Sequence, residues 1–466
     1  MTRADSPIAA RLADYVVAPA RIPSPVLERA RLTMLDTVGC MVGAVGTPTG
    51  ARILTLTRQR GAPGTTTSIG LGGRYRVEDS ALANATLAHL LEFDDGHRPS
   101  DNHLGCVVVP TALTMAQQTQ SSLADCLTAI VVGYDVMGRV GEATLLARNS
   151  SNFHGTGTTG VFGAAAVAAR MLGLPPAQTA QALAVAGTGA AGPKETLTTG
   201  PESKPLHAGR ASLNGITAAY LASLGYTGPL TIFEGTHGFC TAMCDRPRPE
   251  LILDGLGERY SLLESGFKVH STCGMLFTVL DGVLENRARY HLDEHLPAQI
   301  RIGAPTWILE DPPFLRRRPA TGGEARFSFP YAAAAAIVDG EVSLRQMTAE
   351  KLADPRIAAV EDRIVVEYDD EIEKMFVATR EDAFFYYPSS IDFDLDGSHH
   401  RSVHTNPCGY DPNLPLTADE VIAKFRATVG GQLDEATATA VIEAILHGPA
   451  DGGVGPIMDL IGGDER

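Results

Sequence analysis

The pattern of apolar residues changes near residue 285, and this change most constrains the fold. Before it, apolar residues recur at helix spacing in segments rich in alanine and glycine. After it, short stretches of branched residues alternate with polar ones. An aromatic content of only 6% and the presence of 48 glycines favour helices that pack closely through small side chains. At 466 residues the chain exceeds the usual size of one core, so we expect two domains.

The first part of the chain predicts a series of helices. One should run from Ser24 to about Gly43, with Ser24 as its cap and Pro25 in its first turn. Pro110 is likewise expected in the first turn of a helix. Helical periodicity recurs in residues 81–91, 123–137, 161–172, 177–186 and 206–224.

The later part predicts strands interrupted by helix. Residues 299–302 and 363–368 alternate as strands do, and residues 391–395 alternate with aspartates before an Asp396-Gly397 turn. Residues 331–337 read as a helix. A smaller α+β unit is therefore expected here.

Helix returns near the C-terminus, where Thr417 and Glu420 form a capping-box pair. The predicted fold class is mainly α. Residues 1–275 and 405–466 would form a large all-helical domain, and residues 276–404 a smaller α+β domain inserted before the C-terminal helices.

Composition excludes several classes of protein. A formal net charge of -16 argues against nucleic-acid binding, which needs a cationic footprint. No apolar run is long enough to span a bilayer, and the N-terminus lacks the pattern of a secretion signal, so we expect no membrane partner. Seven scattered cysteines fit reduced thiols in the cytoplasm. An acidic protein can still bind an anion where a few cations converge.

The segment 88–116 carries an unusual density of ionisable residues between two helical stretches. They are His89, Glu92, Asp94, Asp95, His97 and His103. A loop whose ends are held by buried helices is a rigid place for acids and bases. The alternative is a solvated acidic loop with capping aspartates.

Three further segments add chemistry of the same kind. His154 lies in a Gly/Thr loop before a small-residue helix, where backbone amides favour an anion. Lys204, His207 and Arg210 follow, the last two on one helix face, which is usually a solvated face. Lys268, His270 and Cys273 lie at the apparent boundary between the domains, a common place for a ligand cleft.

Together these segments resemble the MmgE/PrpD family, which includes 2-methylcitrate dehydratase, cis-aconitate decarboxylase and iminodisuccinate epimerase. The matching stretches span nearly the whole chain in the family's order. They are LDTVGCMVGA from Leu35, AHLLEFDDGH from Ala88, HLGCVVVPTAL from His103, NFHGTGTTGVFGAAA from Asn152, SKPLHAGRASLNG from Ser203, GYTGP from Gly225, ARFSFPYAAAAAIVDGEV from Ala325 and LTADEVIAKF from Leu416.

The resemblance implies an all-helical domain built from both chain ends, an α+β domain between them, a homodimer, and catalysis with neither metal nor organic cofactor. It also implies active-site roles for residues at the family's positions, which are Asp94, His103, His154, Lys204 and Lys268. Members often carry a histidine four residues after the cysteine matched by Cys273, but this chain has Phe277 there. His270 is a candidate replacement for that histidine.

The chemistry implied is removal of a proton or of carbon dioxide next to a carboxylate in a small di- or tricarboxylate. His103 and His154 are the expected general acid and base, and Asp94 would orient a histidine or lysine. Lys204 and Lys268 would stabilise carboxylate charge from opposite walls of an interdomain cleft. Candidate substrate-binding residues are Arg210, His207, His270 and Cys273.

Several alternatives stay open. Dehydration, decarboxylation and epimerisation use similar cationic clefts, with a lyase favoured and an epimerase of an iminodisuccinate-like acid second. His89 and His207 read most simply as hydrogen-bonded histidines of a helical core. A metal-dependent hydrolase is a rival from another class, since the segment 88–103 contains acceptable metal ligands, although it lacks an HExxH-type spacing.

Overall fold

The structure is a computed structural model that describes residues 6–18, 21–61, 63–145, 152–196, 202–381, 387–411 and 413–463. The chain forms two compact units. Unit 1 comprises Met1–Lys194, Ser203–Ser265 and Thr417–Arg466, and unit 2 comprises Glu195–Glu202 and Gly266–Leu416. These junctions lie at 265/266 and 416/417, whereas the sequence places its domain limits at 275/276 and 404/405.

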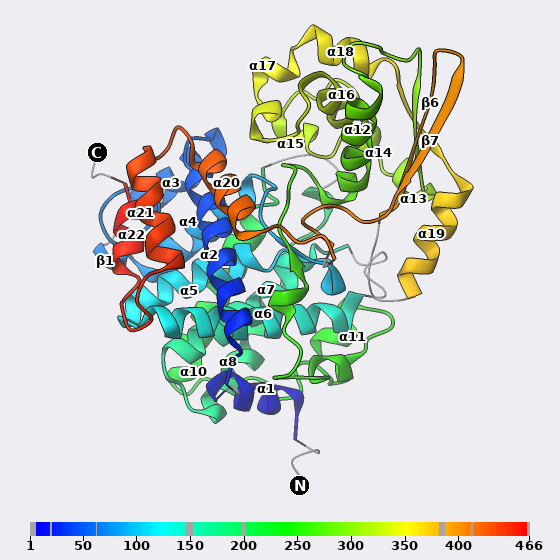
Figure 1. Ribbon diagram of the computed structural model, residues 1–466. Helices are drawn as coiled ribbons and strands as arrows, with labels where there is room; N and C mark the ends of the chain where they lie inside the picture. Colours follow the sequence, from blue (N-terminus) through cyan, green and yellow to red (C-terminus); the bar gives the residue numbers. More distant parts are fainter. Residues whose placement is uncertain are drawn as a thin grey trace. The chain divides into compact units, whose positions relative to one another are not determined.

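Unit 1 is built from helices (Figure 1). Its longer helices are α1 (Ile8–Val17), α2 (Ser24–Ala44), α3 (Pro48–Arg60), α4 (Val77–Leu90), α5 (Gly105–Thr119), α6 (Leu123–Leu145), α7 (Gly155–Met171), α8 (Pro176–Ala186), α10 (Leu206–Ser223), α20 (Ala418–Val429) and α21 (Glu435–Leu446). Its shorter elements are β1 (Pro63–Thr66), β2 (Gly96–His97), α11 (Phe239–Met243) and α22 (Gly455–Ile461), with 3-10 turns at Arg98–Ser100, Gly187–Gly189, Pro249–Ile252 and Ser261–Glu264.

Small residues let these helices approach closely, as composition predicts. A Cβ added at Gly215 of α10 would lie 2.5 Å from the Cβ of Ala164 in α7. One at Gly133 of α6 would lie 2.6 Å from the side chain of Val167. Both distances are shorter than two carbon atoms tolerate, so these crossings require glycine.

Unit 2 combines a four-stranded sheet with short helices. Its strands are β4 (Ile300–Ala304), β5 (Ile364–Tyr368), β6 (Ser389–Leu395) and β7 (Ser398–His404), in the order β5-β4-β6-β7. Its helices are α12 (Phe277–Tyr290), α13 (Thr306–Leu309), α14 (Pro312–Leu315), α15 (Gly322–Ala325), α16 (Phe329–Asp339), α17 (Ala349–Leu352), α18 (Pro355–Glu361) and α19 (Asp370–Glu381), with 3-10 turns at Gly274–Leu276 and Leu344–Met347. The short β3 (Ser265–Gly266) falls at the junction of the units.

The register of this sheet follows from the alternation in its strands. β4 pairs parallel with β5 and antiparallel with β6, and β6 pairs antiparallel with β7. Ile391 and Phe393 are fully buried, and Asp394 between Phe393 and Leu395 is exposed. Asp396 and Gly397 both have positive φ, at 51° and 77°, as a two-residue hairpin turn requires. The predicted hairpin and the mainly α fold class are confirmed.

Two local predictions are wrong. Ser24 is the first helical residue of α2, and the residue before it, Pro23, stands at the cap position with no capping side chain. Pro110 lies inside α5, which begins at Gly105. The predicted helix start was late because the apolar run before Pro110 continues the same helix, and the buried setting tolerates the missing backbone hydrogen bond. The Thr417–Glu420 capping box is confirmed.

Within the described ranges, no helix has the length and apolar character needed to cross a bilayer. All seven cysteines are free thiols.

Candidate active site

The site begins where α4 ends and a buried loop follows. His89 lies in the last turn of α4, and its Nδ1 donates to Oδ2 of Asp94 at 2.8 Å. Both side chains are fully buried. Because a carboxylate accepts, this bond holds the proton of a neutral His89 on Nδ1. Its Nε2 has no hydrogen-bond partner in the described part of the chain.

His103 is anchored by the same loop. Its Nδ1 donates to the main-chain oxygen of Asp95 at 2.7 Å and lies 3.6 Å from Oδ2 of Asp94. A carbonyl oxygen only accepts, so a neutral His103 keeps its proton on Nδ1 and presents Nε2 as a base. The side chain is 16% exposed, unlike that of His89, which is inaccessible. Its main-chain N–H donates to Oγ1 of Thr156 at 3.1 Å, which ties the loop to α7.

Asp95, whose main-chain oxygen holds His103, is itself held by two hydrogen bonds to its side chain. Its carboxylate accepts from the main-chain N–H of Gly105 at 2.8 Å and from the hydroxyl of Tyr134 at 2.9 Å. Burial, followed by the charge of Asp94, raises the pKa of Asp95 to about 7. A Cβ at Gly105 would lie 2.5 Å from Oδ1 of Asp95, so glycine is needed at the start of α5.

His154 and His207 complete a cluster of four imidazoles. His154 stands at the N-terminus of α7, and its ring centroid lies 5.6 Å from that of His89, 6.5 Å from that of His103 and 5.4 Å from that of His207. The His89 and His103 rings are 4.8 Å apart. The Nδ1 atoms of His154 and His207 are 3.2 Å apart, so one carries a proton that it donates to the other.

Both histidines of that pair are neutral at pH 7. Burial, reinforced by the positive charge of Lys204, lowers the pKa of His154 well below its ordinary value. Burial, with smaller contributions from His89 and Lys204, lowers the pKa of His207 to about 4. Each neutral imidazole offers one N–H donor and one nitrogen acceptor for hydrogen bonds.

Lys204 brings a cation into this buried region. It precedes α10 and forms an ion pair with Glu92, whose backbone has a positive φ of 51°. Both side chains are buried. A non-glycine residue held in the left-handed region costs about 1–3 kcal/mol and persists where the surrounding structure compels it. Glu92 thus sets where the Lys204 ammonium lies.

The other predicted binding residue of unit 1 faces outward. Arg210 is exposed on α10, one turn beyond the half-buried His207. The predicted set from unit 1 therefore divides into a cluster of Asp94, His103, His154, Lys204 and His207, and an exposed Arg210.

The predicted residues of unit 2 have local partners. Lys268 is fully buried and donates to the main-chain oxygen of Thr272 at 3.2 Å. His270 donates through Nε2 to Oδ1 of Asp281 at 3.1 Å. Cys273, at the start of a 3-10 turn, is partly exposed.

Phe277 is buried at the start of α12, and its ring contacts two aromatic neighbours. It meets Tyr410 edge to face, with centroids 5.3 Å apart, and His270 at 5.8 Å. The position at which family members often carry a histidine is thus an apolar packing site here.

Among the residues that the structure describes, two groups of side chains have atoms close enough to hold a metal ion. In the first group, His89, Asp94 and His103 each offer one ligand atom, and these atoms lie within 4.8 Å of one another. In the second group, the same holds for His97, Glu142 and Glu264. In the first group, one hydrogen bond already joins His89 to Asp94. In the second, Arg259 pairs with Glu142 at 2.7 Å and with Glu264 at 3.2 Å, which supplies the cation that this acidic group needs.

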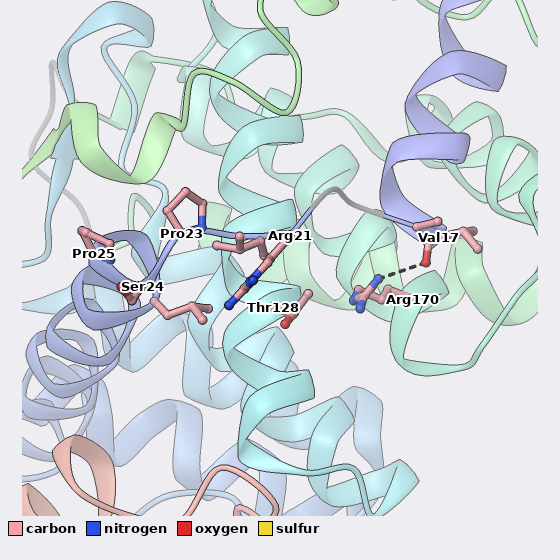
Figure 2. Close-up of a pocket in the computed structure, with 10 residues that line it drawn as sticks. Val17, Arg21, Pro23, Ser24, Pro25, Thr128 and Arg170 are labelled. Atoms are coloured by element: carbon pink, nitrogen blue, oxygen red, sulfur yellow. Dashed lines mark hydrogen bonds between the residues drawn. The ribbon is translucent and has the colours of Figure 1, made fainter.

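The groove shown in Figure 2 shares no lining residue with the histidine cluster. It is lined by Arg21, Pro23, Thr128 and Arg170, among others, and no predicted site residue is among its described lining. Arg170 turns toward the main chain of α1 and donates to the carbonyl of Val17 at 3.2 Å. This groove has no acid–base pair along its described walls.

Sequence reasoning underrated two residues. His89 reads as a core histidine, and it is buried, but its partner is Asp94 and its neighbours are the other imidazoles. Glu92 belongs to the ionisable segment, yet nothing in the pattern pairs it with Lys204. A histidine five residues before Asp94 at a helix end was the available signal.

Known protein families and relatives match the chain along most of its length. The MmgE/PrpD N-terminal domain matches residues 10–252, and the MmgE/PrpD C-terminal domain matches residues 270–447. The chain is 27% identical to the cis-aconitate decarboxylase-like protein oryM of Aspergillus oryzae, over 98% of both chains. It is 23% identical to cis-aconitate decarboxylase of Aspergillus terreus, over 94% of this chain and 92% of the relative. It is 26% identical to human cis-aconitate decarboxylase, over 91% and 87% respectively. The chain therefore belongs to the MmgE/PrpD family.

Proposed function

We propose that the protein is a lyase that acts at carbon next to a carboxylate in a small di- or tricarboxylate, with decarboxylation as its reaction. The observation that carries this proposal is the cluster of four imidazoles, two buried and two partly exposed, beside Asp94 and Lys204. The relatives named cis-aconitate decarboxylases support the choice of decarboxylation over dehydration.

The reaction needs a proton donor and a cation. When the C–C bond to the departing carboxylate breaks, carbon dioxide leaves and the electron pair stays on carbon, spread into a neighbouring unsaturated or carboxylate group. That carbon then takes a proton from an acid. A fixed cation near the developing charge lowers the barrier without reorganisation.

His103 is the proposed proton donor. Its Nδ1 is anchored on the Asp95 carbonyl, so the proton that it exchanges is at Nε2, on a ring that is partly exposed. Protonation makes an imidazolium, and the carboxylate of Asp94, 3.6 Å from Nδ1, stabilises that charge. His154, neutral and at a helix N-terminus, is the proposed second proton carrier.

Lys204 is the proposed carboxylate ligand in unit 1. The pair with Glu92 holds its side chain in place in this buried region. Lys268, Arg210, His207, His270 and Cys273 are retained as proposed binding residues. A homodimer, a cytoplasmic location and independence from metal and cofactor are likewise proposed, and light scattering and assay after dialysis against a chelator test the first and the last.

The test is incubation of the purified protein with cis-aconitate, 2-methylcitrate and simple dicarboxylates in deuterated water. We expect carbon dioxide release and one deuterium in the product, and neither with His103→Gln, which guards against a contaminating enzyme. Dehydration of 2-methylcitrate at metabolic rates would instead make the protein a dehydratase. Deuterium entering recovered substrate without net product would favour the epimerase. Activity that disappears with a chelator and returns with zinc or manganese would favour the metal-dependent hydrolase.

A further inference from the structure

Two of the sequence stretches that resemble the family, LDTVGCMVGA and LTADEVIAKF, contribute none of the site residues named above. The first lies in α2 and the second starts α20, from opposite ends of the chain. The structure packs these two helices together in unit 1. A Cβ at Gly43 of α2 would lie 2.6 Å from the main-chain oxygen of Thr428 in α20, and one at Gly39 would lie 3.0 Å from the ring of Phe425. This close packing fixes α20 against α2.

The same face of α20 carries Lys424 into the interior. Its Nζ lies 2.6 Å from Oδ1 of Asp36 in α2, and both side chains are more than nine-tenths buried. Lys424 also donates to the main-chain oxygen of Phe93 at 2.7 Å and lies 4.2 Å from the centre of the Phe93 ring. One ammonium thus contacts a carboxylate, a carbonyl and an aromatic face.

A buried ion pair is not needed to pack two helices. Desolvation of both charges offsets most of their attraction, and an apolar pair of similar size is often as stable. The contact to Phe93 gives this pair another consequence. The carbonyl of Phe93 belongs to the peptide group that leads into Asp94, the residue that accepts from His89 and lies beside His103.

We propose that Lys424, held by Asp36, is a positioning residue that fixes the Phe93–Asp94 peptide and thereby the Asp94 carboxylate against His89 and His103. On the other side of Phe93, the side-chain carboxylate of Glu92 is paired with Lys204, which precedes α10. Consecutive residues of this loop thus contact two lysines, Glu92 through its side chain and Phe93 through its main-chain oxygen. This proposal rests on the proposed function, because Asp94 acts there through the histidines.

The test separates positioning from folding by removing the pair in two ways. Lys424→Met alone leaves the Asp36 charge buried without its partner, so we expect a large fall in the melting temperature. Asp36→Leu with Lys424→Met removes both charges, and we expect the melting temperature to return near that of the unaltered protein. In that double variant kcat should stay about 10- to 100-fold low, since small displacements of catalytic groups have costs of this size. KM should change less than about threefold, because the carboxylate-binding lysines are retained.

Arg426→Ala is the matched control. Arg426 lies on the same helix and pairs with Glu435 in an exposed position, so its loss should leave kcat unchanged. A double variant that recovers both stability and full kcat would overturn the proposal, since Lys424 would then be structural only. If the double variant does not fold, Lys424→Arg takes its place. The planar guanidinium of arginine does not reproduce the contacts of the ammonium. We therefore expect kcat to fall below about one-third of that of the unaltered protein while the melting temperature stays unchanged. Full kcat would overturn the proposal.

A second readout keeps this test independent of the substrate. Imidazole nitrogen NMR signals of His89 and His103 report their tautomers, which Asp94 and the Asp95 carbonyl hold. We expect these signals to move or split in the folded variant and not in Arg426→Ala. Unchanged signals would overturn the positioning role of Lys424, whether or not the protein turns over a carboxylate. A lack of turnover with every carboxylate tested would instead refute the proposed function.

Discussion

The histidine cluster of unit 1 and the Lys268–Cys273 segment of unit 2 carry similar residue types in different arrangements. In unit 1, three separate segments of the chain supply Asp94 with His103, His154, and Lys204, and these residues interact with one another or with His89 and Glu92. In unit 2, Lys268 donates to the carbonyl of Thr272, four residues along, and His270 donates to Asp281, on the next helix.

The difference teaches how each set responds to change. When titratable groups of one cluster interact through hydrogen bonds and charges, removal of one group changes the pKa values of the others. Groups with local partners respond one at a time. Mutations in the unit 1 cluster should therefore affect several of its side chains at once.

The largest expected effect is loss of an imidazole from the cluster. His103→Gln and His154→Gln should each lower kcat by about two to four orders of magnitude, the usual contribution of a general acid or base. Steady-state kinetics with the accepted carboxylate measure this. His399→Gln, a change on the exposed β7, is the control. Near-normal turnover in both variants would contradict a catalytic role for the histidine cluster.

The two lysines should differ in kind. Lys204→Ala and Lys268→Ala should each weaken carboxylate affinity, by about tenfold for loss of one charge-assisted contact. Only Lys204→Ala should also raise the pKa of His154 and His207, since the Lys204 charge contributes to lowering both. Calorimetry and histidine NMR titration measure the two effects, with the exposed Lys374→Ala as control. Unchanged affinity with a lowered melting temperature would show that the lysines are structural.

A smaller effect is expected at Phe277. Phe277→His restores the residue type that family members often carry, but it places a polar ring among Tyr410 and His270 in a buried site. We expect a loss of about 1–3 kcal/mol in the free energy of unfolding, the cost of burying a polar group without a designed partner. Urea unfolding measures it, and Phe277→Leu keeps the site apolar as a control. An equally stable Phe277→His protein would mean that the site accommodates an imidazole.

The smallest expected effect is on the pH dependence of stability. The pKa of His207 is lowered from 6.5 to about 4, so between these values the unfolded chain binds more protons than the folded one. Its contribution to stability is complete above pH 6.5 and is lost as the pH falls toward 4. The His207→Gln variant should therefore lose less stability than the unaltered protein when the pH falls from 7 to about 4.5. Thermal unfolding at both pH values measures this difference. An identical slope would contradict the lowered pKa.

Much of the fold could be predicted because the signals are local. The period of the apolar residues predicts α2, α6, α7, α8 and α10, and the alternation before Asp396-Gly397 predicts the hairpin of β6 and β7. The start of α5 could not be predicted in this way, because Pro110 resembles a first-turn proline and only burial in the helical core decides otherwise.

The sequence by itself determined the fold class, the family, and the list of residues able to carry acid–base chemistry, because periodicity and residue type are properties of the chain. Only the tertiary structure decided which of them meet. It paired Glu92 with Lys204 across 112 residues of sequence and Asp36 with Lys424 across 388, separations at which no local pattern operates. It also decided their protonation, since the pKa of His154 depends on burial and on charges that arrive from other helices.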